Sequence, residues 1–329
     1  MTLPVDQAFT VPNRLKRLLR LFGALVGLAA TSYFLVVVYR TLTLEDARPL
    51  LTVGMVRVIS LSAIIYALVV PTTGWAWGRL LRGVGVPVPT LQLNMIIGIT
   101  QIAKYLPGNI GQHLGRFAMA VQRGVPPGVV LVTLAAETLL VIGAAVGVST
   151  IALTIVRPDA PTHLLAQSSS LFLAALGAGV VLALLVAMRR PLARLAVRLL
   201  PALAPHVPIQ VPRPGSLSAA SGAYVLNYCL GGAALYYITS SATGVPPPPL
   251  LFCIGVFAVS WVTGFVVPGA PAGLGVREGV MVALLTPALD AATAIQVVIA
   301  FRIVTTLGDV LGLVWGASIL LAATRKEPT

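Results

Sequence analysis

Charged residues are scarce in this sequence, at 9% of 329 residues, whereas soluble domains carry about 25%. Acidic residues are scarcest, with nine Asp and Glu against 22 Lys and Arg. Hydrophobic residues make up 57% of the chain, and the mean hydropathy is +0.96. Because so few charges cannot cover a water-exposed surface, the composition excludes a soluble globular protein and predicts a polytopic membrane protein.

Cysteine and the signatures of soluble enzymes are also lacking. The two cysteines, Cys229 and Cys253, lie in apolar runs, which favours small buried side chains over a disulfide or a metal pair. The sequence has no P-loop, no H-E-x-x-H and no G-x-S-x-G motif. We therefore expect no catalytic residue, no metal and no cofactor.

The net charge of +13 comes from short basic clusters beside apolar segments. This pattern is typical of cytoplasmic loops that face an anionic leaflet, and not of nucleic-acid binding. With the N-terminus inside, the inner clusters fall at residues 14–20, 79–82, 123, 189–213 and 325–326. The pattern predicts a multi-pass protein of the inner or plasma membrane with both termini cytoplasmic.

Eight apolar segments divide into six uninterrupted and two broken ones. A spanning helix needs about 20 apolar residues. Six stretches have this length, at about 18–39, 57–80, 127–156, 168–188, 217–240 and 293–323. The other two, about 90–123 and 249–288, are cut by Pro107-Gly108 and by "PGAPAGLG" at 268–275. Because proline breaks a helix, each broken segment predicts a re-entrant hairpin.

The order helix, helix, broken hairpin, helix occurs twice, over residues 14–156 and 165–323. Glycines and prolines recur at offsets of 164 and 165: Pro107, Gly111 and Gly115 match Pro271, Gly275 and Gly279, and Gly143 and Gly147 match Gly308 and Gly312. Chance matching in a glycine-rich chain is the alternative. Three full crossings in each half make the second half inverted, an arrangement typical of transporters with a midplane site. We expect an all-α fold forming one integral membrane domain over 1–329.

The residues at the breaks predict a polar space inside the protein. Lipid cannot satisfy free backbone groups, so a break at membrane depth belongs inside protein or beside a water-filled cavity. The pairs Gly111/Gly115 and Gly275/Gly279 predict close helix packing, and packing alone is the alternative role for each glycine. A helix that restarts after such a turn favours an anion at its N-terminus. The residues assigned to the re-entrant turns are Pro107, Gly108, Gly111, Gly115, Pro268, Gly269, Pro271, Gly273, Gly275 and Gly279.

Ionisable residues at membrane depth are costly and indicate function or pairing. The candidates for substrate binding are Lys104, His113, Arg116, Glu137, Arg277, Glu278, Arg302 and Asp309, with Arg57 near an outer edge. Five bases and three acids leave a cavity net positive even if every acid is paired. Arg116 and Arg277 are the preferred phosphate contacts, with Arg302, because guanidinium binds phosphate through two donors. Glu137 and Glu278 are expected to hold these arginines or to receive a cationic headgroup.

Some of these candidates have structural alternatives. Arg302 and Asp309 could form salt bridges with a neighbouring helix, and Lys104 could extend to the cytoplasmic interface. His113 could titrate in a proton cycle or could simply be hydrogen-bonded. Glu137 matches Arg302 in the repeat, and the two residues could face each other.

Three polar residues on the stretch 217–240 have a structural interpretation. Tyr224, Asn227 and Tyr228 lie on one predicted spanning helix. Polar side chains inside a membrane usually bond to a neighbouring helix. We therefore predict interhelical hydrogen bonds for all three.

The motifs "KYLPGNIGQHLGR" (104–116) and "PAGLGVREG" (271–279) together resemble the paired signatures of the lysylphosphatidylglycerol synthase transmembrane-region family. The resemblance extends over about residues 14–323, with Asn109 and Ala272 in place of family glycines. It implies a membrane module that moves modified lipid between leaflets in aminoacyl-phosphatidylglycerol synthases. Such modules also occur alone, with glycosyltransferases or in hopanoid gene neighbourhoods. Without a cytoplasmic synthase domain, the chain is not expected to make the aminoacylated lipid.

These observations predict a flippase-like transporter of an anionic phospholipid or a lipid-linked headgroup. One alternative is a membrane-embedded enzyme, or an accessory subunit, for polyprenyl-phosphate sugar or hopanoid lipid synthesis. Another is a transporter of small solutes or ions. A lipid-synthesising enzyme and a second copy of the chain remain open as partners, in addition to the membrane and the lipid substrate.

Overall fold

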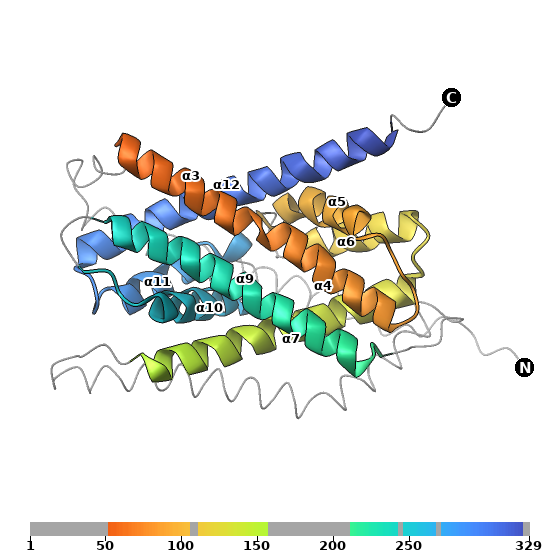
Figure 1. Cartoon of the computed structure of the whole chain (residues 1–329), viewed down its shortest axis with the longest axis horizontal. Coiled ribbons are helices and arrows are strands. Elements are labelled where there is room, and N and C mark those ends of the chain that lie inside the picture. Colours follow the sequence, from red (N-terminus) through yellow and green to blue (C-terminus); the bar gives the residue numbers. More distant parts are fainter. Residues whose placement is uncertain (1–51, 106–110, 157–210, 243–245, 268–270, 325–329) are drawn as a thin grey trace, which may run out of the picture.

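The computed structural model describes residues 52–105, 111–156, 211–242, 246–267 and 271–324 (Figure 1). The elements in this part of the chain are all helical. They are α3 (Val53–Ala67), α4 (Val69–Gly83), α5 (Thr90–Gln101), η2 (Ile102–Tyr105), α6 (Gly111–Gln122), α7 (Pro127–Ile155), α9 (Pro214–Ser241), α10 (Leu250–Val266), η4 (Pro271–Gly273), α11 (Val276–Leu285) and α12 (Ala291–Thr324).

Three helical stretches are long and apolar enough to cross a membrane: Val53–Gly83, Pro127–Ile155 and Ala291–Thr324. They correspond to the spans predicted at 57–80, 127–156 and 293–323, and they support a multi-pass membrane protein. The first stretch consists of α3 and α4, which meet at Leu68. α9 matches the span predicted at 217–240 in length, but serines near its ends and polar residues within it make it less apolar. The spans predicted at 18–39 and 168–188 lie outside the described residues.

The helices of the two broken segments are shorter than a bilayer. α5 and α6 have 12 residues each, α10 has 17 and α11 has 10. At a rise of about 1.5 Å per residue they reach about 15 to 26 Å, whereas the hydrocarbon layer is about 30 Å thick. No member of either pair is therefore long enough to span a bilayer alone. Pro107, Gly108, Asn109, Pro268 and Gly269 lie outside the described residues.

Glycines bring α6 against α5, as the first Gly-x-x-x-Gly pair predicts. A Cβ atom at Gly111 would lie 2.5 Å from the carbonyl oxygen of Ala103, and one at Gly115 would lie 2.8 Å from Cγ2 of Thr100. Because neither position has room for a methyl group, the returning helix packs closely on the one before the break. The close packing predicted for this pair is confirmed.

The second glycine pair has a different role. Gly275 precedes α11 with φ 78°, a left-handed conformation that glycine adopts without strain. A Cβ atom added at Gly279 would have nothing within 4 Å, so the close packing predicted for this residue is wrong. Gly273, with φ 70°, packs instead on Gly264 of α10. The second break thus uses glycine mainly to shape a turn.

The glycines matched between the two halves also differ in their surroundings. Gly308 and Gly312 of α12 face Tyr66 and Val70, and added Cβ atoms would lie 2.6 and 2.8 Å from those side chains. Gly147, the match of Gly312, faces open space. The match of Gly147 with Gly312 therefore does not correspond to a shared packing role.

α9 lies among the other long helices and packs on α3, α4, α7, α10 and α12. Two apolar clusters form around it. One joins residues of α3, α7, α9, α10, α11 and α12, and the other joins residues of α4, α5, α6, α7 and α9. Residues from both groups of helices line a polar cavity.

Candidate functional site

A cavity of about 130 Å³ collects most of the predicted site residues. Of the eight candidates, six line it: Lys104, His113, Arg116, Glu137, Arg277 and Arg302. Its walls come from both broken segments and from α3, α4, α7, α9 and α12. Glu278 and Asp309 are not among the lining residues of this cavity, but each pairs with a base that is. Residues far apart in the sequence therefore form one charged site.

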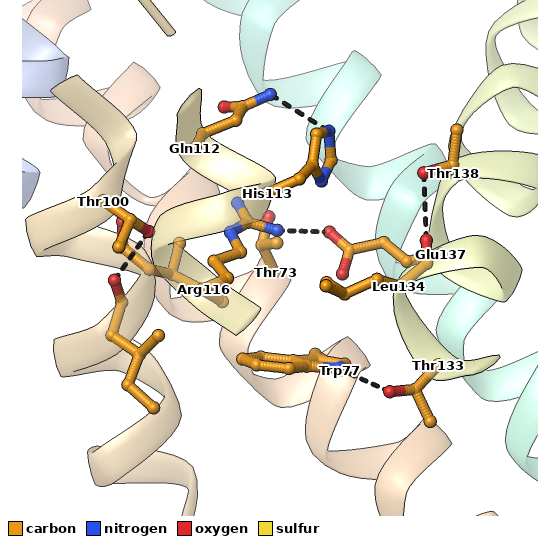
Figure 2. A network of polar contacts seen from close by, with 12 residues as sticks. Thr73, Trp77, Thr100, Gln112, His113, Arg116, Thr133, Leu134, Glu137 and Thr138 are labelled. Carbon is orange, nitrogen blue, oxygen red and sulfur yellow. Dashed lines mark hydrogen bonds and ion pairs between the residues drawn. The ribbon is translucent and has the colours of Figure 1, made fainter. Parts of the chain in front are cut away.

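Arg116 of α6 and Glu137 of α7 form a buried ion pair, with 2.7 Å between Nη1 and Oε1. Figure 2 shows the guanidinium directed across the gap between the helices toward the carboxylate. Both residues are only 4% exposed. The second carboxylate oxygen of Glu137, Oε2, has no hydrogen-bond partner among the described residues. Nearby, Trp77 Nε1 donates to Thr133 Oγ1 at 3.1 Å and joins α4 to α7.

Asp309 of α12 receives donors from the first broken segment. Lys104 Nζ lies 2.7 Å from its Oδ2, and the Tyr105 hydroxyl donates to the same oxygen at 2.6 Å. Gln101 Nε2 donates to Oδ1 at 3.4 Å. Asp309 therefore forms the salt bridge that was the structural alternative for it. Lys104 points to this carboxylate.

Arg302 of α12 pairs with Glu278 of α11 at 3.0 Å. The other oxygen of Glu278 accepts the backbone N–H of Gly275 at 2.7 Å, which closes the turn before α11. Arg302 and Glu137 both line the cavity, but each binds another partner. The idea that they face each other as a pair is not supported among the described ion pairs.

Arg277 differs from the other three bases. It is 7% exposed, and its guanidinium carbon lies 5.2 Å from the ring centre of Phe257 and 5.7 Å from that of Phe301. Within the described part of the chain, it forms no salt bridge, and its Nη2 has no hydrogen-bond partner. The structure thus separates the two preferred phosphate contacts: Arg116 is neutralised by Glu137, whereas Arg277 has no acidic partner among the residues that the structure describes.

The described charges around the cavity leave one positive charge in excess. Among the described residues, four bases and three acids line or adjoin it: Lys104, Arg116, Arg277, Arg302, Glu137, Glu278 and Asp309. Three ion pairs use all three acids, so the excess resides on Arg277. Arg57, the fifth base counted from the sequence, is exposed on α3 and does not line the cavity. The excess of positive charge is therefore one among the described residues, and not the two that five bases and three acids predict.

His113 of α6 lines the cavity beside two neighbours. Its ring meets that of Phe265 edge to face at 6.4 Å between centres, and Gln112 Nε2 lies 3.4 Å from its Nε2. This agrees with the simpler interpretation of a hydrogen-bonded histidine. Figure 2 shows it on the same helix as Arg116.

The aromatic wall of the cavity was not identified from the sequence. Phe257, Trp261 and Phe265 of α10 line it, and the last two rings stack at 4.9 Å between centres. Their spacing of four residues places them on one helix face, which is a signal that the sequence carries. Aromatic rings give the cavity an apolar side that faces its charged side.

The interhelical hydrogen bonds predicted for α9 are confirmed for two residues of three. Asn227 Nδ2 donates to Thr73 Oγ1 at 3.0 Å, and Tyr228 Oη donates to the carbonyl of Val141 at 3.1 Å. Tyr224 is buried and lines the cavity, but its hydroxyl has no partner among the described residues. The hydrogen bond predicted for Tyr224 is therefore not found in the described part of the chain.

No group of three His, Cys, Asp or Glu side chains that could hold a metal ion occurs in the described ranges. Cys229 and Cys253 are free thiols. The described residues that line the cavity offer charged groups, hydrogen-bonding groups and aromatic rings. Its donors, acceptors and rings suit a polar ligand with an anionic group.

Comparison with protein families gives a match over most of the chain. The model described as the lysylphosphatidylglycerol synthase TM region matches residues 24–312. Comparison with curated proteins gives no match. The matched range includes every residue that lines the cavity.

Proposed function

We propose that this chain, which belongs to the lysylphosphatidylglycerol synthase TM-region family, moves an anionic phospholipid or lipid-linked headgroup between leaflets. The family is a membrane domain linked to lipid handling. The observation that carries the proposal is Arg277, a buried base at the cavity wall without a salt bridge among the described residues. An uncompensated buried charge destabilises a protein by roughly 3–5 kcal/mol, and a bound phosphate would supply the missing counter-charge.

The surroundings of Arg277 favour an anion that comes from outside the protein. Phe257 and Phe301 contact the guanidinium and offer no acceptor, so its donors remain available. The other three bases are already neutralised and therefore do not compete with Arg277 for the anion. A guanidinium also presents two parallel donors that match a phosphate.

We further propose that the two broken segments are re-entrant hairpins in an inverted repeat with six full spans. Their short helices and the polar cavity support this, because non-helical backbone at membrane depth needs protein or water beside it. Each returning helix is also bound to the next helix by an ion pair: α6 to α7 by Arg116 and Glu137, and α11 to α12 by Glu278 and Arg302. In the first pair the base is on the returning helix and the acid on the next helix, whereas in the second pair the acid is on the returning helix.

The basic clusters support an orientation with both termini cytoplasmic in the inner or plasma membrane. We propose that the headgroup passes through the cavity while its tails remain in lipid. On this view the chain transports lipid and catalyses no bond change.

A scrambling assay tests the proposal. The full chain is reconstituted in liposomes containing trace phosphatidylglycerol with a fluorophore on its acyl chain, so that the headgroup is intact. Dithionite then bleaches the outer leaflet, and transport appears as bleaching beyond the outer half. We expect faster loss with the protein than in empty liposomes, and an at least tenfold slower rate for Arg277→Gln, since one lost charge-assisted contact is worth about 1.5–3 kcal/mol.

Arg57→Gln is the matched control, because Arg57 is an exposed arginine on α3 away from the cavity. It should transport at the rate of the unmodified chain. Phosphatidylcholine with the same acyl label reports on the need for a net negative charge. Equal rates for empty and loaded liposomes, or an Arg277→Gln chain as fast as Arg57→Gln, would overturn the proposal.

A further inference from the structure

We propose that α3 is a lateral gate of the cavity, which rotates about its junction with α4 and closes when an anion occupies Arg277. This rests on the proposed function, in which the headgroup passes through the cavity while its tails remain in lipid. Such a path requires an opening in the side wall of the cavity, because the tails stay attached to the headgroup throughout. α3 is the part of the described wall whose contacts allow this movement.

The hinge lies at the junction of α3 and α4. The two helices form one apolar stretch, Val53–Gly83, that is interrupted at Leu68 (Figure 1). Pro71 explains the interruption, because it has no N–H for the carbonyl of Ala67 and its ring crowds the preceding turn. The Thr72 hydroxyl donates to the carbonyl oxygen of Leu68 at 2.9 Å, a bond that often accompanies a helix bend. The span therefore has a hinge near its centre.

The two halves of this span are held in the bundle differently. α4 has nine buried residues among its 15, whereas α3 has four among the same number. Trp77 of α4 donates to Thr133 of α7, and Asn227 of α9 donates to Thr73 of α4. Among the described residues, no side-chain hydrogen bond or ion pair joins α3 to another helix. Few buried contacts give a segment a low cost of local opening, so α3 can move while α4 stays in place.

α3 covers the cavity at the meeting of two other helices. It packs on α9 and α12, which both contribute residues to the cavity wall. Tyr66, in its last turn, lines the cavity and lies against Gly308 of α12, where an added Cβ atom would be 2.6 Å from the ring. Because a glycine presents a flat surface, the ring can leave it without unlocking other side chains. Movement of α3 therefore opens the cavity sideways between α9 and α12.

One polar atom on the inner face of α3 favours this opening. Ser62 is fully buried, and its hydroxyl has no hydrogen-bond partner among the described residues. A buried hydroxyl without a partner destabilises the conformation that buries it, and contact with water removes this cost. The closed position of α3 is therefore less stable than an all-apolar contact of the same size.

Tyr66 also connects the gate to Arg277. Its ring meets those of Phe257 and Phe301 edge to face, with 6.4 and 6.5 Å between ring centres. The same two rings contact the Arg277 guanidinium, whose carbon lies 5.2 and 5.7 Å from their centres. An anion that fixes Arg277 thus also fixes the two rings against which Tyr66 packs. An occupied cavity should hold α3 closed, and an empty one leaves it free to open.

Hydrogen exchange of backbone amides in the purified full chain measures the gate directly. In detergent without added lipid, amides of residues 56–66 should exchange about tenfold or more faster than amides of residues 74–82. The reason is that opening of α3 breaks fewer contacts than opening of α4. Equal exchange rates in the two halves of the span would overturn the gate.

Pro71→Ala tests the hinge, because alanine supplies the N–H that proline lacks. It should reduce the difference in exchange between the two halves about threefold or more, and slow scrambling by a similar factor. The matched control is Pro127→Ala, since Pro127 begins α7, where a helix needs no N–H at this position. If Pro71→Ala exchanges and scrambles like Pro127→Ala, the hinge is absent and the proposal is wrong.

Added lipid tests the connection to Arg277. Saturating phosphatidylglycerol should slow exchange of residues 56–66 about threefold or more and leave residues 74–82 unchanged, whereas phosphatidylcholine should change neither. Tyr66→Leu removes the ring and should abolish this response, and Tyr66→Phe keeps the ring and should keep the response. A Tyr66→Leu chain that responds like Tyr66→Phe would overturn the connection.

The exchange measured without lipid distinguishes this inference from the proposed function. If the chain scrambles lipid while both halves of the span exchange equally, the proposed function stands and the gate is wrong. If residues 56–66 exchange fast but the chain neither scrambles lipid nor responds to phosphatidylglycerol, the hinge stands and the proposed function fails, together with the closure of the gate by an anion.

Discussion

Glu278 follows Arg277 directly in the sequence, yet its carboxylate lies 3.0 Å from Arg302 on another helix. Its second oxygen accepts the backbone N–H of Gly275, so one side chain joins α11, its preceding turn and α12. Neighbours on a helix point about 100° apart, which lets Arg277 and Glu278 face different surroundings. This is why Arg277 reaches the cavity without its adjacent acid.

The first prediction concerns the charge that Glu278 supplies. Glu278→Gln keeps an acceptor for Gly275 but leaves Arg302 without its counter-charge. The free energy of unfolding should fall by up to about 3 kcal/mol, because Arg302, whose side chain is 20% exposed, loses its partner. Affinity for anionic lipid should rise, because the site then holds two uncompensated positive charges. Thermal unfolding measures the change in stability, and lipid titration of the same preparation measures the change in affinity. A loss of lipid affinity alongside the loss of stability would contradict the charge count.

The second prediction concerns the pair of Arg116 and Glu137. Arg116→Met leaves a buried carboxylate uncompensated and should destabilise the chain by about 3–5 kcal/mol. The double variant with Glu137→Met should recover most of this loss, because apolar side chains of similar size can replace a buried pair. A double-mutant cycle of unfolding free energies measures the coupling. Additive losses in the cycle would show that the two side chains do not depend on each other.

The positions of the breaks and of the ionisable residues could be predicted from the sequence. A Pro-Gly pair within an apolar run disrupts a helix through local geometry, with no need for tertiary contacts. A charge at membrane depth stands out for a similar reason, since its cost is large in any fold. Six of the eight candidates line the cavity because these two local signals mark the same region.

The choice of partners could not be predicted, because it depends on how distant helices pack. Lys104 and Asp309 are 205 residues apart, and nothing in the sequence links them. Tyr224 and Tyr228 look alike on one helix face, yet among the described residues Tyr228 has a carbonyl partner and Tyr224 has none. Gly279 repeats the spacing of Gly115 but has no neighbour to pack against. In each case the sequence identifies the group but not its surroundings.

The third prediction compares two glycines that the sequence treats as equivalents. Gly111→Ala places a methyl group 2.5 Å from the backbone oxygen of Ala103, so η2 and α6 must move apart. The expected cost is about 1–3 kcal/mol, as for other overpacked sites. Gly279→Ala meets nothing within 4 Å and should stabilise α11 by up to about 1 kcal/mol, because alanine favours helix. Unfolding free energies of the two variants should therefore shift in opposite directions, and a shared sign would contradict the packing described for the first break.

The fourth prediction concerns Ala272, where the family pattern has glycine. Ala272 has φ 51° and ψ 26°, a left-handed conformation that costs an L-residue about 1–2 kcal/mol. Ala272→Gly relieves this strain, although glycine also gives the unfolded chain about 0.4–1 kcal/mol of added entropy. The net effect should be a stabilisation of roughly 0.5–1 kcal/mol by these two terms.

The same substitution elsewhere in the chain provides the control for Ala272→Gly. Ala118 is an exposed residue inside α6, where the backbone is helical and alanine is preferred. Ala118→Gly should therefore destabilise the chain by about 1 kcal/mol. Opposite shifts of the unfolding midpoint would locate the strain in the turn between α10 and α11. If Ala272→Gly also destabilises the chain, Ala272 does not strain the turn, and the prediction is wrong. Because Ala272 also lines the cavity, lipid affinity measured on the same samples tells whether this turn must be strained to hold Arg277 in place.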